Sequence, residues 1–394
     1  MSESALDIER LRRETPGTQE VIHLNNAGAA LMPQPVVDAV IAHLQLEARI
    51  GGYEAADAAA ERVEGVYASA ARLIGAEPDE IAVVENATRA WDMAFYSIPF
   101  RPGDRILTSR SEYASNVISF LQVARQRGVS VEVIPSDESG QVDVVALERM
   151  LDARVKLIAI SHVPTNGGLV QPAAEIGRVA RQAGVLYLLD ACQSVGQLPV
   201  DVGALGCDLL SATSRKYLRG PRGVGFLYAR RGIVAQLEPP LLDLHAARWV
   251  APDRYEIRPD ARRFENWETN YAAKLGMGAA IEYALGVGIE SGWQRLRGLA
   301  EQLRAQLAEI PGVQVHDLGR VRGGIVTFSR EGVDSEEIKR RLAAERINVT
   351  TSSIFSTRYD MSARNLGTMV RASTHYYNTE DELARLLDVV EGLT

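Results

Sequence analysis

The chain has 394 residues, of which 46% are hydrophobic and 24% charged, so it can bury the core of a large α/β unit or of two domains. Its formal net charge of −8, with no dense run of Lys and Arg, argues against a nucleic-acid-binding protein. Two cysteines and six scattered histidines give neither a disulfide framework nor the spacing of a metal site. An acidic N-terminus without an apolar signal core, and no apolar run of about 18 residues, predict a cytoplasmic protein without a membrane span.

Residues 1–20 are expected to form an N-terminal arm, and a short strand from Val21 then breaks into small residues. Apolar periodicity predicts alternating helices and strands from there on. The predicted helices are 35–44, 57–74, one beginning near 86, 115–127, 144–151 and 172–183; the predicted strands are 81–84, 104–108, 129–135, 155–161, 185–190, 207–212 and 224–228. Near-continuous apolar strands separated by helices indicate a mainly parallel sheet with helices on both faces. Ligands bind such sheets beyond the carboxyl ends of the strands, where Thr165, Asp190 and Lys216 fall.

The pattern changes at 240–270, which is irregular and rich in charged and aromatic residues. A helix over 271–287 follows. The elements predicted after it are helices at 296–310, 335–345 and 380–393 and strands at 324–328 and 370–373. This order predicts a smaller α+β domain, with boundaries of 1–20 for the arm, 21–255 for the large domain and 256–394 for the small domain.

The stretch around Lys216 carries the strongest chemical indication. Thr213, Ser214 and Arg215 precede the lysine at the end of a strand, and Gly220-Pro-Arg-Gly turns the chain into the next strand. An amine beside hydroxyl and guanidinium donors suits a Schiff base with a phosphorylated aldehyde cofactor. Alone, Lys216 is more simply a solvated surface lysine.

Asp190 also indicates a cofactor site. It ends the preceding strand, 26 residues before Lys216. A carboxylate facing a pyridine nitrogen keeps the ring protonated and makes it an electron sink. A strand-end Asp is often only a helix cap. Asp190 occurs together with Lys216 and with Gln193, three residues further on. This combination is poorly explained by chance.

These residues resemble the class V branch of the fold-type I pyridoxal-phosphate enzymes, which includes cysteine desulfurases, class V aminotransferases, kynureninases and isopenicillin N epimerase. The resemblance extends from His23-Leu-Asn-Asn-Ala-Gly to Val370-Arg-Ala-Ser, and its most specific parts are Leu189-Asp-Ala-Cys-Gln-Ser and Thr213-Ser-Arg-Lys216. It implies an α/β fold with a seven-stranded, mainly parallel sheet between helices and a smaller α+β C-terminal domain. It also implies pyridoxal 5'-phosphate as cofactor and a small amino-acid substrate.

The resemblance assigns roles by position. Lys216 would bind the cofactor covalently, Asp190 would pair with its ring nitrogen, and Arg371 would clamp the substrate carboxylate. The other cofactor-binding residues implied are Ala87, Thr88, Thr213 and Arg215 for the phosphate, Gln193 and Thr165 for the phenolic oxygen, and Tyr113 where desulfurases stack a histidine. Asn26 and Tyr53 are further substrate-binding candidates.

The reaction is inferred from positions where this chain differs from its relatives and from short segments that are similar to one group of them. Desulfurases carry a nucleophilic cysteine about where Thr350–Ser356 lies, whereas in this chain no cysteine follows Cys207, which argues against a cysteine desulfurase. Segments 47–57, 214–225 and 346–351 are similar to hercynylcysteine sulfoxide lyases, which implies a carbon–sulfur β-lyase that gives pyruvate and ammonia. An aminotransferase or an epimerase of the same superfamily uses the same residues and stays open, as does a non-catalytic binding module.

Relatives of this class are homodimers with active sites at the subunit interface. The resemblance therefore implies a homodimer in which Tyr53 and the segment 264–270 could reach the partner's cofactor. One of Glu268, Thr269 and Asn270 would contact the partner's phosphate. A plain structural interface loop is the alternative for this segment.

Overall fold

A computed structural model describes residues 6–393, so the first five residues of the expected arm lie outside the described part. Its centre is a seven-stranded sheet in the order β2-β8-β7-β6-β5-β3-β4. These strands are β2 (Ile81–Val84), β8 (Gly225–Ala229), β7 (Leu209–Thr213), β6 (Leu186–Asp190), β5 (Val155–Ser161), β3 (Arg105–Thr108) and β4 (Ser130–Val133). Strand β8 is antiparallel to both of its neighbours, and the other pairings are parallel.

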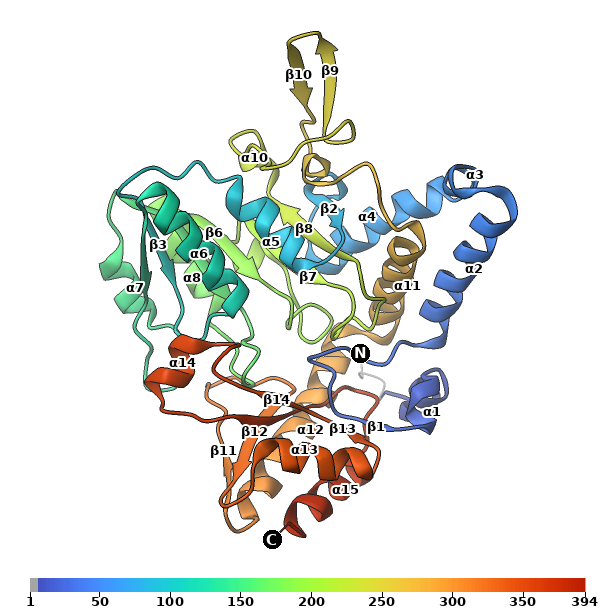
Figure 1. Ribbon diagram of the computed structural model, residues 1–394, viewed down its shortest axis with the longest axis vertical. Helices are drawn as coiled ribbons and strands as arrows, with labels where there is room; N and C mark the ends of the chain where they lie inside the picture. The colour runs from blue at the N-terminus through green and yellow to red at the C-terminus, as the bar shows by residue number, and fades with distance from the viewer. Residues whose placement is uncertain (1–5, 394) are drawn as a thin grey trace, which may run out of the picture.

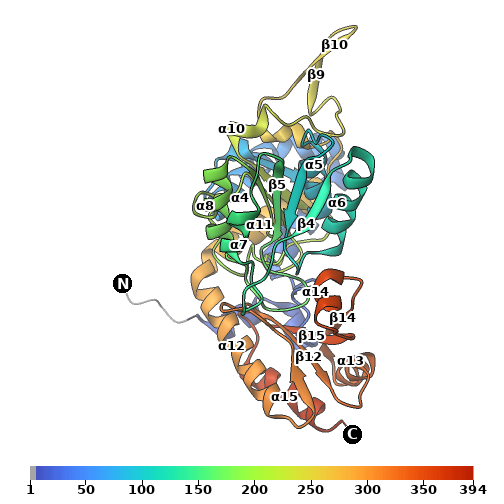
Figure 2. The same ribbon diagram turned by 90° about the vertical axis from the view of Figure 1, so that its left-hand side faces the viewer.

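Helices cover both faces of this sheet, as the side view in Figure 2 shows. One face packs on α4 (Ala60–Ile74), α7 (Val144–Met150), α8 (Ala173–Ala183) and α11 (Tyr271–Val287). The other face packs on α5 (Ala87–Tyr96) and α6 (Ala114–Arg127). Because both faces are buried, the central strands are apolar at nearly every position, and β7 is buried throughout.

A second, four-stranded antiparallel sheet has the order β11-β12-β15-β14. Its strands are β11 (Val313–Val315), β12 (Ile325–Arg330), β15 (Met369–Ser373) and β14 (Thr350–Ser352), and its core includes residues of α12 (Ile289–Glu309), α13 (Ser335–Ala344) and α15 (Glu380–Glu391). Strand β1 (Ile22–His23) crosses from the N-terminal part and pairs in parallel with β13 (Ile347–Asn348). The small sheet lies below the carboxyl edge of the large sheet in Figure 1.

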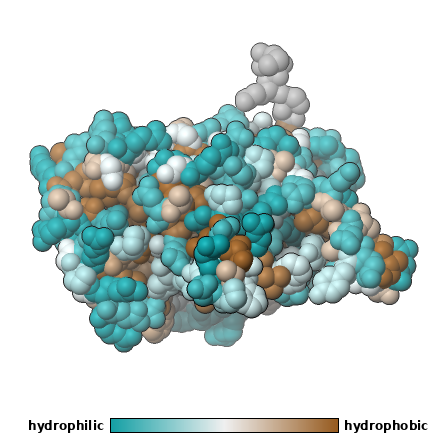
Figure 3. Space-filling view, turned by 90° about the horizontal axis from the view of Figure 1, so that it is seen from above, coloured by the Kyte–Doolittle hydropathy of each residue, from teal (hydrophilic) through white to brown (hydrophobic). Residues whose placement is uncertain are grey.

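The remaining elements lie around these two sheets. They are α1 (Ile8–Arg13), η1 (Pro16–Gln19), α2 (Gln34–Ile50), α3 (Gly52–Ala58), η2 (Pro78–Glu80), α9 (Val202–Leu205), α10 (Arg231–Val234), β9 (Ala247–Ala251), β10 (Arg254–Ile257), η3 (Ala261–Phe264) and α14 (Arg358–Ala363). The β9–β10 hairpin projects from the molecule at the end opposite the small sheet (Figure 1). Seen from this hairpin end, apolar residues form separate patches among hydrophilic ones (Figure 3).

The predicted fold class is confirmed, including the seven-stranded, mainly parallel sheet and the smaller α+β part. The boundary at 255/256 stays a prediction; α11, which lies beyond it, packs against α2 and α4 of the large part. The segment 240–270, expected to be irregular, contains the β9–β10 hairpin. No helix within residues 6–393 is both long enough and apolar enough to cross a membrane.

Candidate active site

A pocket of about 450 Å³ opens at the carboxyl edge of the large sheet, where β5, β6 and β7 end. This volume is in the range that small-molecule and cofactor sites occupy. Its lining residues are Asn86, Ala87, Thr88, Tyr113, Ser161, Val163, Thr165, Asp190, Cys192, Gln193, Thr213, Arg215 and Lys216. The structure thus brings together all nine residues that the sequence suggested for the cofactor, drawn from positions 87 to 216.

One end of the pocket is suited to an anion. Helix α5 begins there at Ala87, and its N-cap Asn86 accepts a hydrogen bond from the backbone N–H of Arg89 at 2.9 Å. The N–H groups of Ala87 and Thr88 remain at the open helix end, which carries a partial positive charge. Arg215 adds a full positive charge to the same lining. A phosphate group therefore fits this end of the pocket.

Asp190 lies at the end of β6 and is held by two donors. Its Oδ1 accepts the backbone N–H of Cys192 at 2.9 Å, and its Oδ2 accepts Nδ2 of Asn116 at 3.1 Å. The carboxylate is buried but lines the pocket. A carboxylate fixed in this way can hold a proton on a ring nitrogen of a bound aromatic cofactor.

Lys216 follows β7 in a tight turn. The backbone N–H of Gly220 donates to Ser214 O at 2.9 Å, and that of Arg219 donates to Lys216 O at 2.9 Å, so the turn closes on both sides of the lysine. Burial lowers the pKa of the Lys216 amine, and the neighbouring positive charge of Arg215 lowers it further, although Asp190 acts in the opposite direction. A larger share of neutral amine makes Lys216 a better nucleophile and a better base near neutral pH.

Two further residues of the lining, Gln193 and Tyr113, bear on what the pocket can bind. Gln193 donates from Nε2 to Ala27 O at 3.1 Å, and its buried Oε1 finds no donor within residues 6–393. A buried orphan acceptor is costly unless a ligand completes it. Tyr113, the N-cap residue of α6, is partly exposed at the mouth of the pocket. These two residues and the anion-binding end all fit pyridoxal phosphate.

The three predicted substrate residues are placed differently. Arg371 on β15 donates from Nη1 to the Thr165 hydroxyl at 2.7 Å and therefore lies directly beside the pocket. Asn26 is fully buried, donates to Ser373 O at 2.7 Å and accepts from the Tyr377 hydroxyl, so its carboxamide is engaged within the protein. Tyr53 is 74% exposed on α3. The structure therefore brings Arg371, but neither Asn26 nor Tyr53, to the pocket of this chain.

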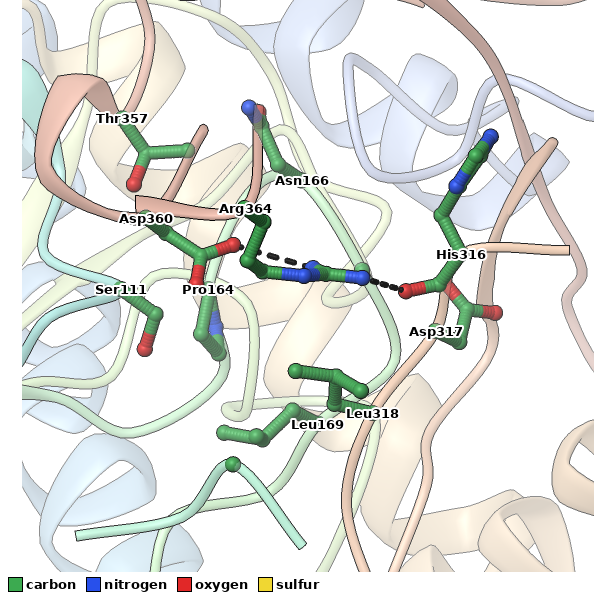
Figure 4. Close-up of a pocket in the computed structure, with 12 residues that line it drawn as sticks. Ser111, Pro164, Asn166, Leu169, His316, Asp317, Leu318, Thr357, Asp360 and Arg364 are labelled. Carbon is green, nitrogen blue, oxygen red and sulfur yellow. Dashed lines mark hydrogen bonds and ion pairs between the residues drawn. The ribbon is translucent and has the colours of Figure 1, made fainter. Parts of the chain in front are cut away.

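A second, much smaller cavity is lined by Pro164 and Asn166 on one side and by His316, Asp360 and Arg364 on the other (Figure 4). It holds about 20 Å³, which is room for about one water molecule. Across it, Arg364 pairs with Asp360 at 3.1 Å and donates to His316 O at 2.6 Å, as the dashed lines in Figure 4 show. Asp360 also pairs with Arg110 at 3.1 Å. These contacts fasten α14 to Arg110 and to His316.

The sequence interpretation missed Glu112 and Asn116. Both are almost fully buried, and Asn116 joins Glu112 to Asp190. Their spacing of four residues at the start of a helix was visible, but their link to Asp190 depends on the packing of α6 against β6. A single sequence does not contain that contact.

The sheet, the buried lysine and the strand-end carboxylate define a pyridoxal-phosphate-dependent enzyme of fold type I. The family model described as "Aminotransferase class-V" matches residues 22–386, and the chain belongs to this family. It is 30% identical to a probable cysteine desulfurase of Methanothermobacter thermautotrophicus over 392 residues, covering 98% of each chain. It is 29% identical to a probable cysteine desulfurase of Pyrococcus abyssi, covering 98% of this chain and 97% of the other.

Solved structures agree with these sequence relationships. The apo structure of a cysteine desulfurase from Thermococcus onnurineus superposes with a TM-score of 0.92 at 28% identity, covering 99% of this chain and 98% of that chain. The expectation of a hercynylcysteine sulfoxide lyase is therefore wrong, because these relatives over nearly the full length carry cysteine desulfurase names. The local segments that suggested the lyase, 47–57, 214–225 and 346–351, make up a small part of the 392 residues that align with the first relative.

Proposed function

We propose that this chain is a class V aminotransferase that removes the amino group of a small amino acid and passes it to a keto acid. The observation that carries the proposal is the constellation of Lys216, Asp190 and Arg371 around one pocket, beside a loop that offers no thiol. An epimerase is the closest variant, because it needs the same proton removal at the substrate α-carbon.

We assign to Lys216 the removal and return of the proton at the substrate α-carbon. Its lowered pKa leaves part of the amine neutral, and a neutral Nζ can take a proton from the substrate α-carbon and return it elsewhere. Bound pyridoxal phosphate supplies an electron sink for the electron pair left at that carbon. Asp190 contributes a fixed negative charge for the protonated ring, held by Asn116 and by the Cys192 N–H.

Arg371 is the residue we assign to the substrate carboxylate. Burial lowers its pKa to about 10, so the guanidinium is still charged at neutral pH. Nη1 is occupied by Thr165, whereas Nε has no partner within residues 6–393. A buried unpaired N–H of a charged group favours an anionic ligand. This arrangement supports an α-amino acid as substrate.

The loop beside the pocket supports aminotransfer over chemistry that needs a nucleophile. Residues 350–356 read Thr-Thr-Ser-Ser-Ile-Phe-Ser and contain hydroxyl and apolar side chains alone. The backbone N–H of Ala114, next to Tyr113, donates to Ser356 O at 2.9 Å, which keeps this loop near the pocket mouth. Aminotransfer requires no side chain from the loop as a reactant.

Cysteine desulfuration is the second candidate, because the relatives from Methanothermobacter thermautotrophicus and Pyrococcus abyssi carry that name. It requires a thiol to accept the substrate sulfur, and Cys192 is the one thiol in the pocket lining. Burial raises the Cys192 pKa well above its ordinary value, and Asp190 raises it further. A neutral thiol is a poor nucleophile, so the geometry favours this candidate less.

The test is a product assay on cofactor-loaded protein. A panel of amino acids is supplied with 2-oxoglutarate or pyruvate, and L-cysteine is supplied separately with a reductant. Keto-acid-dependent formation of a new amino acid supports the proposal. Alanine and sulfide from L-cysteine, without any keto-acid-dependent turnover, would replace it by desulfuration. Cys192→Ala then reports whether that thiol takes part.

We also propose that the active form is a homodimer. Large apolar side chains are exposed at one end of the molecule: Leu241, Leu244, Trp249, Tyr255 and Trp267 are each more than half exposed. Exposed groups of this kind favour burial against another protein surface. Sedimentation of the cofactor-loaded protein tests this proposal, and a monomer at micromolar concentration would contradict it.

A further inference from the structure

Glu112 is a buried carboxylate behind the lining of the pocket. It lies between the end of β3 and the start of α6, and 1% of it is exposed. Five donors surround its two oxygens: Tyr113 N at 2.9 Å, Asn116 Nδ2 at 2.8 Å, Ser161 N at 2.8 Å, Ser161 Oγ at 2.5 Å and Thr108 Oγ1 at 3.2 Å. Three of these are N–H groups that can only donate. The site is therefore built to accept a negative charge, although it is closed to water.

Asn116 connects this carboxylate to the pocket. Its Nδ2 donates to Glu112 Oε1 at 2.8 Å and to Asp190 Oδ2 at 3.1 Å. An amide nitrogen carries two hydrogens, so each carboxylate receives one. The opposite orientation of the carboxamide would point its oxygen at two carboxylates, so the nitrogen is the atom that faces both of them. Neither Glu112 nor Asn116 lines the pocket itself.

We propose that Glu112 is a positioning residue for the cofactor site: it holds Asn116, and through Asn116 the carboxylate of Asp190, and it adds its own negative charge behind Asp190. Ser161 is the second link, because it donates to Glu112 from both its N–H and its hydroxyl and also lines the pocket. Glu112 thereby ties the ends of β5 and β6 to the start of α6.

The electrostatics agree with this role. Burial raises the pKa of Glu112, the hydrogen bonds from Ser161 and Asn116 lower it, and the like charge of Asp190 raises it; together these effects give a pKa of about 7. Glu112 also helps to raise the pKa of the buried phenol of Tyr187 on β6; Tyr113 and the buried His162 are the next neighbours in sequence of Glu112 and of its partner Ser161. A cationic group bound at Asp190 favours the ionised form of Glu112, and the charge of Glu112 in turn favours the bound cation.

The experiment uses cofactor-loaded protein and four variants. Glu112→Gln removes the charge at nearly constant volume, Glu112→Asp retains it, Asn116→Leu removes the bridge, and the Glu112→Gln/Asn116→Leu double variant tests whether both act through one chain. Glu382→Gln is the matched control, since Glu382 is a buried carboxylate on α15 that does not line the pocket and contacts neither Glu112 nor Asp190 among the described hydrogen bonds. The readouts are the pH midpoint of the visible absorbance of the bound cofactor, its dissociation constant and the thermal midpoint.

Loss of a negative charge behind Asp190 disfavours the protonated form of the bound cofactor. We expect Glu112→Gln to lower the absorbance midpoint by about half a pH unit or more and to weaken cofactor binding by about fivefold to tenfold. Asn116→Leu removes the bridge but no charge, so it should weaken cofactor binding and shift the midpoint less than Glu112→Gln does. Glu112→Asp should return the midpoint toward the wild-type value. In the double variant the loss of cofactor binding should be smaller than the sum of the two single losses, because both single changes break the contact between Glu112 and Asn116. Glu382→Gln should leave the midpoint unchanged.

A purely structural role predicts a different result. If the thermal midpoint falls in Glu112→Gln while the absorbance midpoint and the dissociation constant stay at their wild-type values, the inference is overturned. Additive losses of cofactor binding in the double variant would contradict the bridge through Asn116. The inference depends on cofactor binding and not on which reaction follows, so failure of the aminotransfer proposal in the product assay leaves this test intact.

Discussion

Arg371 and Thr165 are joined by two hydrogen bonds, from Nη1 of the arginine to the threonine hydroxyl at 2.7 Å and to its carbonyl oxygen at 3.1 Å. Arg371 belongs to the small sheet, and Thr165 belongs to the loop after β5 of the large sheet. The contact holds a charged side chain of one sheet over the pocket of the other. Any rearrangement of the two sheets would move the guanidinium relative to Lys216.

Replacement of Arg371 should therefore affect the substrate more than the cofactor. Arg371→Leu removes a charge-assisted hydrogen-bond donor worth about 1.5–3 kcal/mol, which predicts a loss of about tenfold to a hundredfold in kcat/KM. Steady-state kinetics with the preferred amino acid measures this loss. Thr165→Val is the control: it keeps the guanidinium and should cost less. Loss of cofactor absorbance in Arg371→Leu would contradict a substrate role.

Gly196 should be hard to replace because of the backbone around Lys216. Its φ is +82°, and a Cβ there would lie 2.6 Å from Leu218 N and from Tyr217 C. Gly184 has a similar φ of +66° but open space around it. We expect Gly184→Ala to cost about 1 kcal/mol for the left-handed backbone, and Gly196→Ala to cost at least about 1 kcal/mol more for the added clash. Urea unfolding of both variants measures the difference, and equal costs would refute it.

His162 should make stability depend on pH. Burial lowers its pKa from 6.5 to about 4. Between these values the unfolded chain binds more protons than the folded chain, so stability is complete above about pH 6.5 and is lost as the pH falls toward 4. The difference corresponds to about 3 kcal/mol at most. Urea unfolding of wild type and His162→Gln at pH 7.5 and 5 tests this: the variant should lose less stability, and equal losses would contradict the burial argument.

Asp360 should control the segment beside the pocket. It pairs with Arg110 and with Arg364, each at 3.1 Å, and its side chain is only 10% exposed. Asp360→Asn leaves these two arginines without a counter-charge, so hydrogen exchange over 353–366 should become faster while the large sheet stays protected. Glu148→Gln, which removes an exposed pair with Arg178, should change little. Unaltered exchange over 353–366 would show that the ion pairs do not hold this segment.

The large sheet could be predicted because its strands can be identified from their own apolar composition. Residues 155–161 and 185–190 are apolar almost throughout, and a strand buried on both faces needs that composition. Parallel strands then place their carboxyl ends at one edge, which is why Asp190 and Lys216 were predicted to meet. The helix expected from 296 begins earlier, at Ile289. Gly292 lies inside the helix at the point where it packs against Tyr376.

Other features depend on contacts between distant residues. The β9–β10 hairpin is mostly exposed on both faces, with Trp249 at 77%, so it has no alternating pattern to find. Glu112 meets Ser161 across 49 residues, and Arg110 meets Asp360 across 250. The lyase prediction was wrong because it rested on three short segments, whereas the relatives that match over nearly the full length carry cysteine desulfurase names.

The attachment point of the cofactor tests the account most directly. The chain has four lysines, Lys156, Lys216, Lys274 and Lys339, and Lys216 is the one that lines the pocket. Borohydride reduction of the protein with pyridoxal phosphate, followed by peptide mass mapping, fixes the cofactor to the lysine that holds it. We predict one modified peptide, which contains Lys216, and none in Lys216→Ala. Modification of another lysine, or a Lys216 peptide that stays unmodified in coloured protein, would contradict the assignment of this pocket.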